Sequence, residues 1–350
     1  MTKEFRIGGK LVGEGNDPYI IAEVGINHNG NADIAKEMIR VAAAAGVDAI
    51  KFQTFKTEEF LTDKTVLYTY TSQGEEITES MFDMFKRTEL SDEEWRELKE
   101  CCDDCGVDFL STPASTEGTQ LLVDLGAVAI KVSSDELTNI PQIREYAKFG
   151  LPLIVSCGMG SADEIQKVLD VTSSEERDVC LLLCTSQYPT PPEDVNALKL
   201  LEMRKLFPDV AVGLSDHTQG STAAVLCVAL GACVFEKHFT LDHDMPGPDQ
   251  WFSSDPAELT EWVTQIREAH KMLGTRVLEP TATEMEMRES FRKSIVALTS
   301  IKAGEIFSLE NIGVRRPGTG MPPEELDAVL GRCAANDLLP DHLISAEDIA

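Results

Sequence analysis

Positive charge is scarce in this 350-residue sequence, because 31 lysines and arginines stand against 60 aspartates and glutamates, for a formal net charge of −29. A field of that sign repels nucleic acid and anionic membrane surfaces, so we expect neither as a partner. No apolar run approaches the length that crosses a bilayer, and the first residues, MTKEFRIGGKLVGEG, lack the apolar segment of an export signal. The sequence therefore predicts a cytoplasmic protein.

A disulfide or zinc framework is also lacking, although the chain has nine cysteines. Three of them form CCDDC, whose single Cys-x-x-Cys pair, Cys102 and Cys105, has no second pair and no neighbouring histidines to complete a zinc site. The other six stand singly in apolar surroundings typical of a core: Cys157, Cys180, Cys184, Cys227, Cys233 and Cys333.

Short apolar runs alternate with amphipathic segments of helical length, and we count eight such units. The runs are YIIAEVG, DAIKFQT, DFLSTP, AVAIKVS, PLIVSCG, VCLLLCTS, VAVGLSD and CVFEKHF. Runs that are apolar throughout and separated by helices are typical of parallel strands, and eight in series close a (β/α)8 TIM barrel. An open doubly wound sheet is the alternative, but no GxGxxG turn follows the first run. We therefore predict an α/β barrel over residues 1–273.

Three segments depart from the repeat. FRIGGKLVG, before the barrel, predicts a hairpin at its floor. Residues 57–91 are far too long for an ordinary connection and predict a lid. After the barrel, residues 274–287 are polar and predict a linker, and the short β-like runs of 288–350 predict a small β-rich domain.

Polar side chains stand at the end of every predicted strand, where the chemistry of a TIM barrel takes place. Two apolar strands end in lysine, Lys51 in IKFQT and Lys131 in IKVSSDE, and a buried lysine needs an anionic partner. If both face one mouth, the partner expected is a phosphate or carboxylate. His217 and His238 end neighbouring strands and predict a site for a borderline divalent ion such as manganese or zinc. His28 is a further candidate for the mouth.

The motifs, taken in order, resemble those of the sialic acid synthases over nearly the whole chain. They are IIAEVGINHNG, IKFQTF, STPAS, IKVSSDE, SCGM, CTSQYPTPPEDVNALKLL, GLSDHT, EKHFTLD and RRPGTG. The resemblance implies a TIM barrel followed by a small C-terminal antifreeze-like (SAF) domain. It also implies condensation of phosphoenolpyruvate with an N-acylated mannose-type sugar, such as N-acetylmannosamine, to a nine-carbon 2-keto acid and phosphate.

The same resemblance implies roles for individual residues. His217 and His238 would hold a divalent metal, with Mn²⁺ preferred and Mg²⁺ or Co²⁺ as alternatives. Arg316 of RRPGTG would reach the sugar's acyl group in the partner subunit, which implies a domain-swapped homodimer. The implied phosphoenolpyruvate-binding residues are Lys51, Thr112, Lys131, Ser134, Ser156 and Ser215. The implied catalytic residues are Glu23, Glu136 and Asp216, and Gln53, Tyr188 and Asp249 join Arg316 around the sugar.

The sugar stays open at this point. Ser186 of CTSQYPT stands where some N-acetylneuraminate synthases have asparagine, so a legionaminate or pseudaminate synthase acting on a 2,4-diacetamido-2,4,6-trideoxy sugar is the alternative. MPGPD and RRPGTG look more like the neuraminate and legionaminate branches. Octulosonate synthases are shorter and lack a SAF domain. A non-catalytic carbohydrate-binding barrel is a distant alternative, disfavoured because unpaired buried charges are costly to retain.

Overall fold

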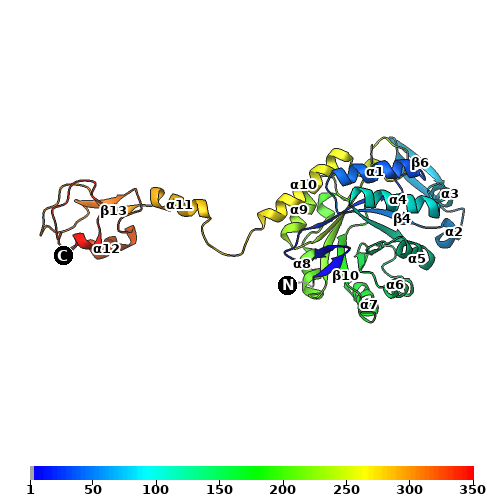
Figure 1. Cartoon of the computed structure of the whole chain (residues 1–350), viewed down its shortest axis with the longest axis horizontal. Coiled ribbons are helices and arrows are strands. Elements are labelled where there is room, and N and C mark those ends of the chain that lie inside the picture. The colour runs from blue at the N-terminus through cyan, green and yellow to red at the C-terminus, as the bar shows by residue number, and fades with distance from the viewer. Residues whose placement is uncertain (1–3) are drawn as a thin grey trace. The chain divides into compact units, whose positions relative to one another are not determined.

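The computed structural model describes residues 4–350, which form two compact units separated after Gly274 (Figure 1). The first unit is a barrel of eight parallel strands, each hydrogen-bonded to its neighbours in chain order, with the last strand closing on the first. The strands are β3 (Tyr19–Gly25), β4 (Ala49–Thr54), β7 (Asp108–Pro113), β8 (Ile130–Val132), β9 (Leu153–Ser156), β10 (Val179–Cys184), β11 (Ala211–Asp216) and β12 (Val234–His238). Each coincides with a predicted apolar run, so the TIM-barrel prediction is confirmed.

Helices surround the strands of this unit (Figure 1). They are α1 (Ala32–Ala44), α4 (Asp92–Cys105), α5 (Thr116–Asp124), α6 (Ile140–Lys148), α7 (Ala162–Ser173), α8 (Lys199–Leu206), α9 (Thr222–Ala229) and α10 (Pro256–Met272), with 3-10 turns η1 (Pro192–Asp194) and η2 (Gln250–Phe252). Local signals fix their ends: α4, for example, begins at a Ser91–Glu94 capping box and ends at Gly106 in the left-handed conformation, φ 70°. Their apolar faces pack on the outward side chains of the strands, where Trp262 of α10 is almost fully buried.

The predicted hairpin closes the N-terminal end of the barrel. β1 (Phe5–Ile7) pairs antiparallel with β2 (Lys10–Val12), and Gly8 between them adopts φ 56°, which favours glycine. Phe5 and Val12 join the cluster of apolar side chains that fills the barrel interior. The hairpin closes the barrel interior at this end, and the chemistry of a TIM barrel is expected at the carboxyl ends of the strands.

The long segment 57–91 is ordered and anchored. It contains α2 (Thr57–Phe60), β5 (Leu67–Ser72), β6 (Glu75–Ser80) and α3 (Met81–Lys86), and β5 and β6 form a hairpin. Ser72 Oγ accepts a 3.1 Å hydrogen bond from Gly247 N, and Gln73 Nε2 donates to Asp244 O at 2.8 Å. The hairpin is therefore tied to the loop that follows β12, at the catalytic end of the barrel.

The second unit has its own small core. It contains α11 (Ala282–Phe291), β13 (Ser294–Ala297), β14 (Ile312–Arg315), α12 (Leu326–Val329), η3 (Pro323–Glu325) and η4 (Ala346–Asp348). β13 and β14 pair antiparallel, and Ile295, Phe307 and Ile344 are buried in the core. α11 begins inside the predicted linker 274–287, at a Thr281–Glu284 capping box. Within the described residues, no helix has the length and apolarity to span a membrane.

Candidate active site

Four buried charged side chains meet inside the barrel at the carboxyl ends of the strands. Lys51 Nζ lies 2.8 Å from Glu23 Oε2 and 3.8 Å from Glu236 Oε2, and Lys131 Nζ lies 3.7 Å from Glu236 Oε1. No side chain of this tetrad (Glu23, Lys51, Lys131 and Glu236) is more than 6% exposed. Two cations and two anions give it no formal net charge, which is what allows four charges to be buried together.

Hydroxyl groups complete the surroundings of the two lysines. Lys51 Nζ donates to Thr112 Oγ1 at 3.0 Å, and Lys131 Nζ donates to Ser156 Oγ at 2.8 Å. Both hydroxyls were predicted members of an anion site. The structure therefore brings each predicted lysine next to a predicted hydroxyl partner.

The two carboxylates of the tetrad also have polar neighbours. Ser215 Oγ donates to Glu236 Oε1 at 3.3 Å, and Gln53 Nε2 donates to Glu23 Oε1 at 3.4 Å. Glu236 lies in the eighth strand, near its carboxyl end, yet the sequence analysis gave it no role. The signal for it was present, because it lies two residues before His238 and therefore faces the same side of the strand.

The pKa values of Glu23 and Glu236 are shifted in opposite directions. Burial, with the charge of Glu236 adding to it, raises the pKa of Glu23 to about 7 although Lys51 opposes the shift. Burial also opposes ionisation of Glu236, but Lys131 and Lys51 outweigh it and hold the pKa of Glu236 below its ordinary value. Glu23 is therefore the member of the tetrad suited to exchange a proton near neutral pH.

The two predicted metal-ligating histidines lie together beside the tetrad. Their ring centroids are 5.5 Å apart, and His217 Nδ1 lies 2.8 Å from the carbonyl oxygen of Thr185. That bond places a proton on Nδ1, and although burial opposes ionisation, hydrogen bonding to Cys184 and Thr185 holds the pKa of His217 above its ordinary value. Burial and the surrounding cations hold the pKa of His238 well below its ordinary value, so its imidazole is neutral, and its buried Nδ1 has no hydrogen-bond partner.

These features fit a divalent metal ion. A pair of imidazoles from neighbouring strand ends is a donor set that suits a borderline divalent ion, and His238 is already in the neutral form that ligates. Among the described residues, no third His, Cys, Asp or Glu atom lies close enough to this pair to form a cluster of three ligand atoms. Water or substrate would have to fill the remaining positions, as in catalytic rather than structural sites.

Cys184 is a site residue that the sequence analysis placed in the core. It ends β10, and Ser134 Oγ lies 3.3 Å from its sulfur. Burial opposes ionisation of the thiol, but hydrogen bonds from His217 and Ser134 lower the pKa of Cys184. Ser134 also accepts a 3.0 Å hydrogen bond from Gly158 N, so this predicted residue lies on the wall of the site.

Aromatic rings pack beside the two histidines of the predicted metal site. Tyr188, a predicted sugar residue, packs on His217 at 4.2 Å between centroids. Phe252, which the sequence analysis did not single out, lies 5.1 Å from Tyr188 and 5.3 Å from His238. Asp249 is near enough to His217 for that histidine to lower its pKa, but burial dominates and raises the pKa of Asp249 to about 6.

Asp216, which was predicted to be catalytic, does not contact the tetrad in the described part of the chain. Its carboxylate accepts hydrogen bonds from Trp262 Nε1 of α10 at 3.0 Å and from Lys237 Nζ at 3.1 Å. Side chains alternate along β11, so Ser215 points into the barrel and Asp216 points outward. Both partners of Asp216 lie on that outer side of the strands. His28 is likewise not at the mouth: its ring packs against Phe52 on the outer side, and burial lowers its pKa to about 4.

The structure leaves the predicted roles of two other residues untested. Glu136 accepts a 2.6 Å hydrogen bond from Asn139 within its own loop and is not joined to the tetrad by any contact in the described part of the chain. Arg316 belongs to the second unit, where its Nε donates to Phe291 O and its guanidinium lies 5.0 Å from that ring.

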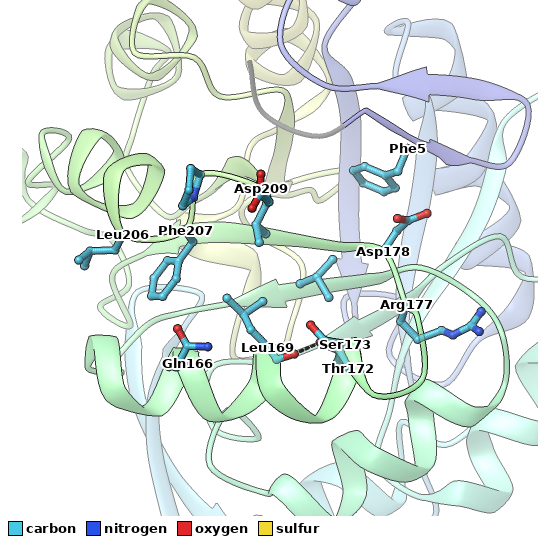
Figure 2. Close-up of a pocket in the computed structure, with 13 residues that line it drawn as sticks. Phe5, Gln166, Leu169, Thr172, Ser173, Arg177, Asp178, Leu206, Phe207 and Asp209 are labelled. Atoms are coloured by element: carbon cyan, nitrogen blue, oxygen red, sulfur yellow. Dashed lines mark hydrogen bonds between the residues drawn. The ribbon is translucent and has the colours of Figure 1, made fainter.

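A cavity of about 310 Å³ lies at the opposite end of the barrel (Figure 2). Phe5 of the floor hairpin and Leu169 of α7 line it, together with Val179 and Val210 at the beginnings of β10 and β11. None of the predicted site residues lines this cavity. The candidate chemistry therefore lies with the tetrad and the histidine pair, and not in this cavity.

The barrel is plugged at one end, carries a buried lysine pair and a histidine pair at its mouth, and is followed by a small β-rich unit. Two known families match this chain. Residues 38–277 match the NeuB family, and residues 292–350 match the SAF domain. The chain belongs to the NeuB family, and its relatives include proteins named as legionaminic acid, N-acetylneuraminate-9-phosphate and pseudaminic acid synthases.

Individual relatives span almost the whole chain. An uncharacterized protein of Methanocaldococcus jannaschii is 41% identical and covers 99% of both chains. The N,N'-diacetyllegionaminic acid synthase of Campylobacter jejuni is 38% identical over 93% of this chain and 98% of its own. The crystal structure of the sialic acid synthetase of Leptospira borgpetersenii matches with a TM-score of 0.74 and 32% identity, covering 82% of this chain and 95% of that one.

Proposed function

We propose that this protein condenses phosphoenolpyruvate with an N-acylated mannose-type sugar to a nine-carbon 2-keto acid, releasing phosphate. The observation that carries the proposal is the tetrad, in which Lys51 and Lys131 are buried at the mouth and each donates a hydrogen bond to a hydroxyl group. In so acidic a chain, a buried lysine pair is the feature suited to an anionic substrate. Family membership supports the same reaction.

Lys51 and Lys131 would hold the phosphate and carboxylate, with Thr112, Ser134 and Ser156 as hydroxyl donors around them. Their charges offset the negative charge that accumulates on the phosphate as it leaves. Because both ammonium groups are already fixed by their carboxylate and hydroxyl partners, little reorganisation accompanies the reaction.

A Mn²⁺ ion held by His217 and His238 would supply Lewis acidity to the aldehyde oxygen of the open-chain sugar. Tyr188 would pack against the sugar beside this pair, and Asp249 would accept hydrogen bonds from its hydroxyls. Carbon 3 of phosphoenolpyruvate then forms the new bond to the aldehyde carbon, which leaves carbon 2 electron-poor. Water adds to carbon 2, and the resulting species expels phosphate.

Glu23 is the residue we propose to take the proton from that water. Its pKa of about 7 means that it is largely ionised above neutrality and can still release the proton afterwards. Lys51 contacts Glu23 at 2.8 Å, so the carboxylate and the phosphoenolpyruvate-binding lysine are held next to each other. A base adjacent to the electron-poor carbon is the arrangement that the step needs.

The sugar is proposed as an N-acylated mannose-type sugar, with the 2,4-diacetamido-2,4,6-trideoxy sugar of legionaminate synthesis as the alternative. The Campylobacter jejuni relative, named as a legionaminic acid synthase, supports the alternative, and the Leptospira borgpetersenii structure supports a sialic acid. The hairpin of β5 and β6 is anchored at the mouth and would contact the end of the sugar that does not react.

The test is phosphate release from phosphoenolpyruvate with each sugar in turn. We expect release with Mn²⁺ and one of the sugars, loss of release on chelation, and its recovery when Mn²⁺ is returned. Lys51→Met should abolish release, whereas Lys205→Met, at a lysine whose side chain is 74% exposed, is the matched control and should not. Turnover that survives exhaustive chelation would contradict the metal, and no release with either sugar would contradict the reaction.

A further inference from the structure

The two histidines of the proposed metal pair are held in place differently. His217 is oriented by a hydrogen bond between Nδ1 and the Thr185 carbonyl. His238 has no such bond, because its Nδ1 is buried without a partner. Ligating imidazoles are ordinarily fixed by a hydrogen bond on the second ring nitrogen, so something else must set the orientation of His238.

Aromatic packing is what surrounds His238 instead. The Phe252 ring lies 5.3 Å from the imidazole at an interplanar angle of 70°, and the Tyr188 ring lies 5.8 Å away at 89°. Both are edge-to-face arrangements, which aromatic pairs prefer. Tyr188 in turn packs on Phe252 and on His217, so the two imidazoles and two aromatic rings form one contiguous set.

The turn that carries Phe252 is itself rigidly attached to the barrel. Gln250, in the same 3-10 turn, is buried, and its side chain donates to Asn27 O at 2.9 Å and accepts from Thr240 Oγ1 at 2.5 Å. Ser253, directly after the turn, accepts a 3.0 Å hydrogen bond from Asn27 Nδ2. Phe252 is therefore presented to His238 by a turn whose neighbours on both sides are fixed.

We propose that Phe252 is a positioning residue that holds the His238 imidazole in the orientation needed to bind the metal. The inference rests on the metal site of the proposed function. Packing replaces the missing hydrogen bond: the ring of Phe252 blocks rotation of the imidazole, so a nitrogen lone pair stays directed at the ion. Removal of the ring frees His238 to rotate and weakens metal binding without removing a ligand.

The experiment measures Mn²⁺ binding to the full-length, substrate-free protein by electron paramagnetic resonance of the free ion. Phe252→Ala should weaken Mn²⁺ affinity about tenfold, as the loss of outer contacts to a metal ligand ordinarily does. Phe252→Tyr retains the ring and should restore affinity. Trp251→Ala is the matched control, because Trp251 lies in the same turn and packs on Phe252, and none of its ring contacts in the described structure involves either histidine. It should leave affinity near that of the wild type.

Phe252→Leu keeps most of the apolar volume and replaces the alanine variant if that one does not fold; it should also lose affinity. Unchanged affinity in the Ala or Leu variant would overturn the proposal, as would an equal loss in Trp251→Ala. A wild-type protein that binds no Mn²⁺ would overturn it together with the metal part of the proposed function. Mn²⁺ binding that follows these expectations without any condensation activity would leave the positioning role standing and contradict the reaction alone.

Discussion

Replacing Glu23 with glutamine should raise the stability of the barrel relative to the wild type as the pH increases, while abolishing turnover. Burial raises the pKa of Glu23 from its ordinary value of 4.5 to about 7. The folded protein therefore binds this proton more tightly than the unfolded chain does. The stability that Glu23 contributes is fully present below pH 4.5 and is lost as the pH rises through about 7. Glutamine has nearly the same shape and never ionises, so it escapes that loss.

The magnitude follows from the two pKa values. At about 1.4 kcal/mol for each pH unit, a displacement from 4.5 to about 7 corresponds to about 3 kcal/mol. Of this, about 2.5 kcal/mol should develop between pH 5 and pH 8. The free energy of unfolding of the Glu23→Gln variant, relative to the wild type, should rise by that amount over this interval.

The assay is urea unfolding followed by tryptophan fluorescence at several pH values. All three tryptophans, Trp95, Trp251 and Trp262, belong to the first unit, so the signal reports the barrel alone. Titrating groups that do not contact Glu23 are common to both proteins and cancel in the difference. A difference in unfolding free energy that stays flat from pH 5 to pH 8 would refute the reasoning about Glu23, and so would a variant that retains turnover.

Three further outcomes are expected. Lys131→Ala should fold and lose phosphoenolpyruvate affinity far more than sugar affinity, measured by calorimetry; equal losses would argue against a dedicated anion role. Asp216→Ala should lower the unfolding free energy by about 3–5 kcal/mol, because it leaves the buried Lys237 without its carboxylate partner. Turnover per folded molecule should be retained, and a fully stable but inactive variant would contradict a structural role for Asp216. Arg316→Ala and Lys131→Ala, each nearly inactive alone, should recover roughly a quarter of wild-type activity when refolded together, if Arg316 serves the site of a partner subunit; no recovery would contradict the domain-swapped dimer.

The barrel could be predicted because its signal is local. Each strand is an apolar run followed by an amphipathic helix, and the count of eight determines closure. The same pattern located the mouth, since the carboxyl end of each strand is the point where polar residues begin. Lys51, Lys131, His217 and His238 were found in this way, and the structure places all four at one end of the barrel.

The sequence held the signal for the direction in which the Asp216 side chain points. Side chains alternate along a strand, so in LSDH the inward positions are Ser215 and His217, and Asp216 must face the helices. The same alternation in FEKH turns Glu236 inward and Lys237 outward, where Lys237 meets Asp216 on the neighbouring strand. The positions of the strand ends show which residues lie at the mouth of the barrel. The alternation of side chains along each strand is needed to show which of these residues point into it.

The setting of Phe252 could not be predicted, because it depends on contacts between residues far apart in the chain. Gln250 is held by Asn27, 223 positions away, and nothing in the local sequence indicates that pairing. Segment 57–91 was recognised by its length, but the attachment of its hairpin to Asp244 and Gly247 also joins distant segments. Loops of this kind take their structure from what they pack against.

The charge balance of the tetrad has a consequence for how an anion can enter. With Glu23 and Glu236 ionised, the two lysines are already neutralised, so a phosphate or carboxylate arriving beside them adds uncompensated negative charge to a buried site. Glu23, whose pKa is about 7, is the group that can respond by taking up a proton, which it must release again before it can accept one from the attacking water. Binding of the anion would then draw protons from solution, and its measured heat would depend on which buffer supplies them.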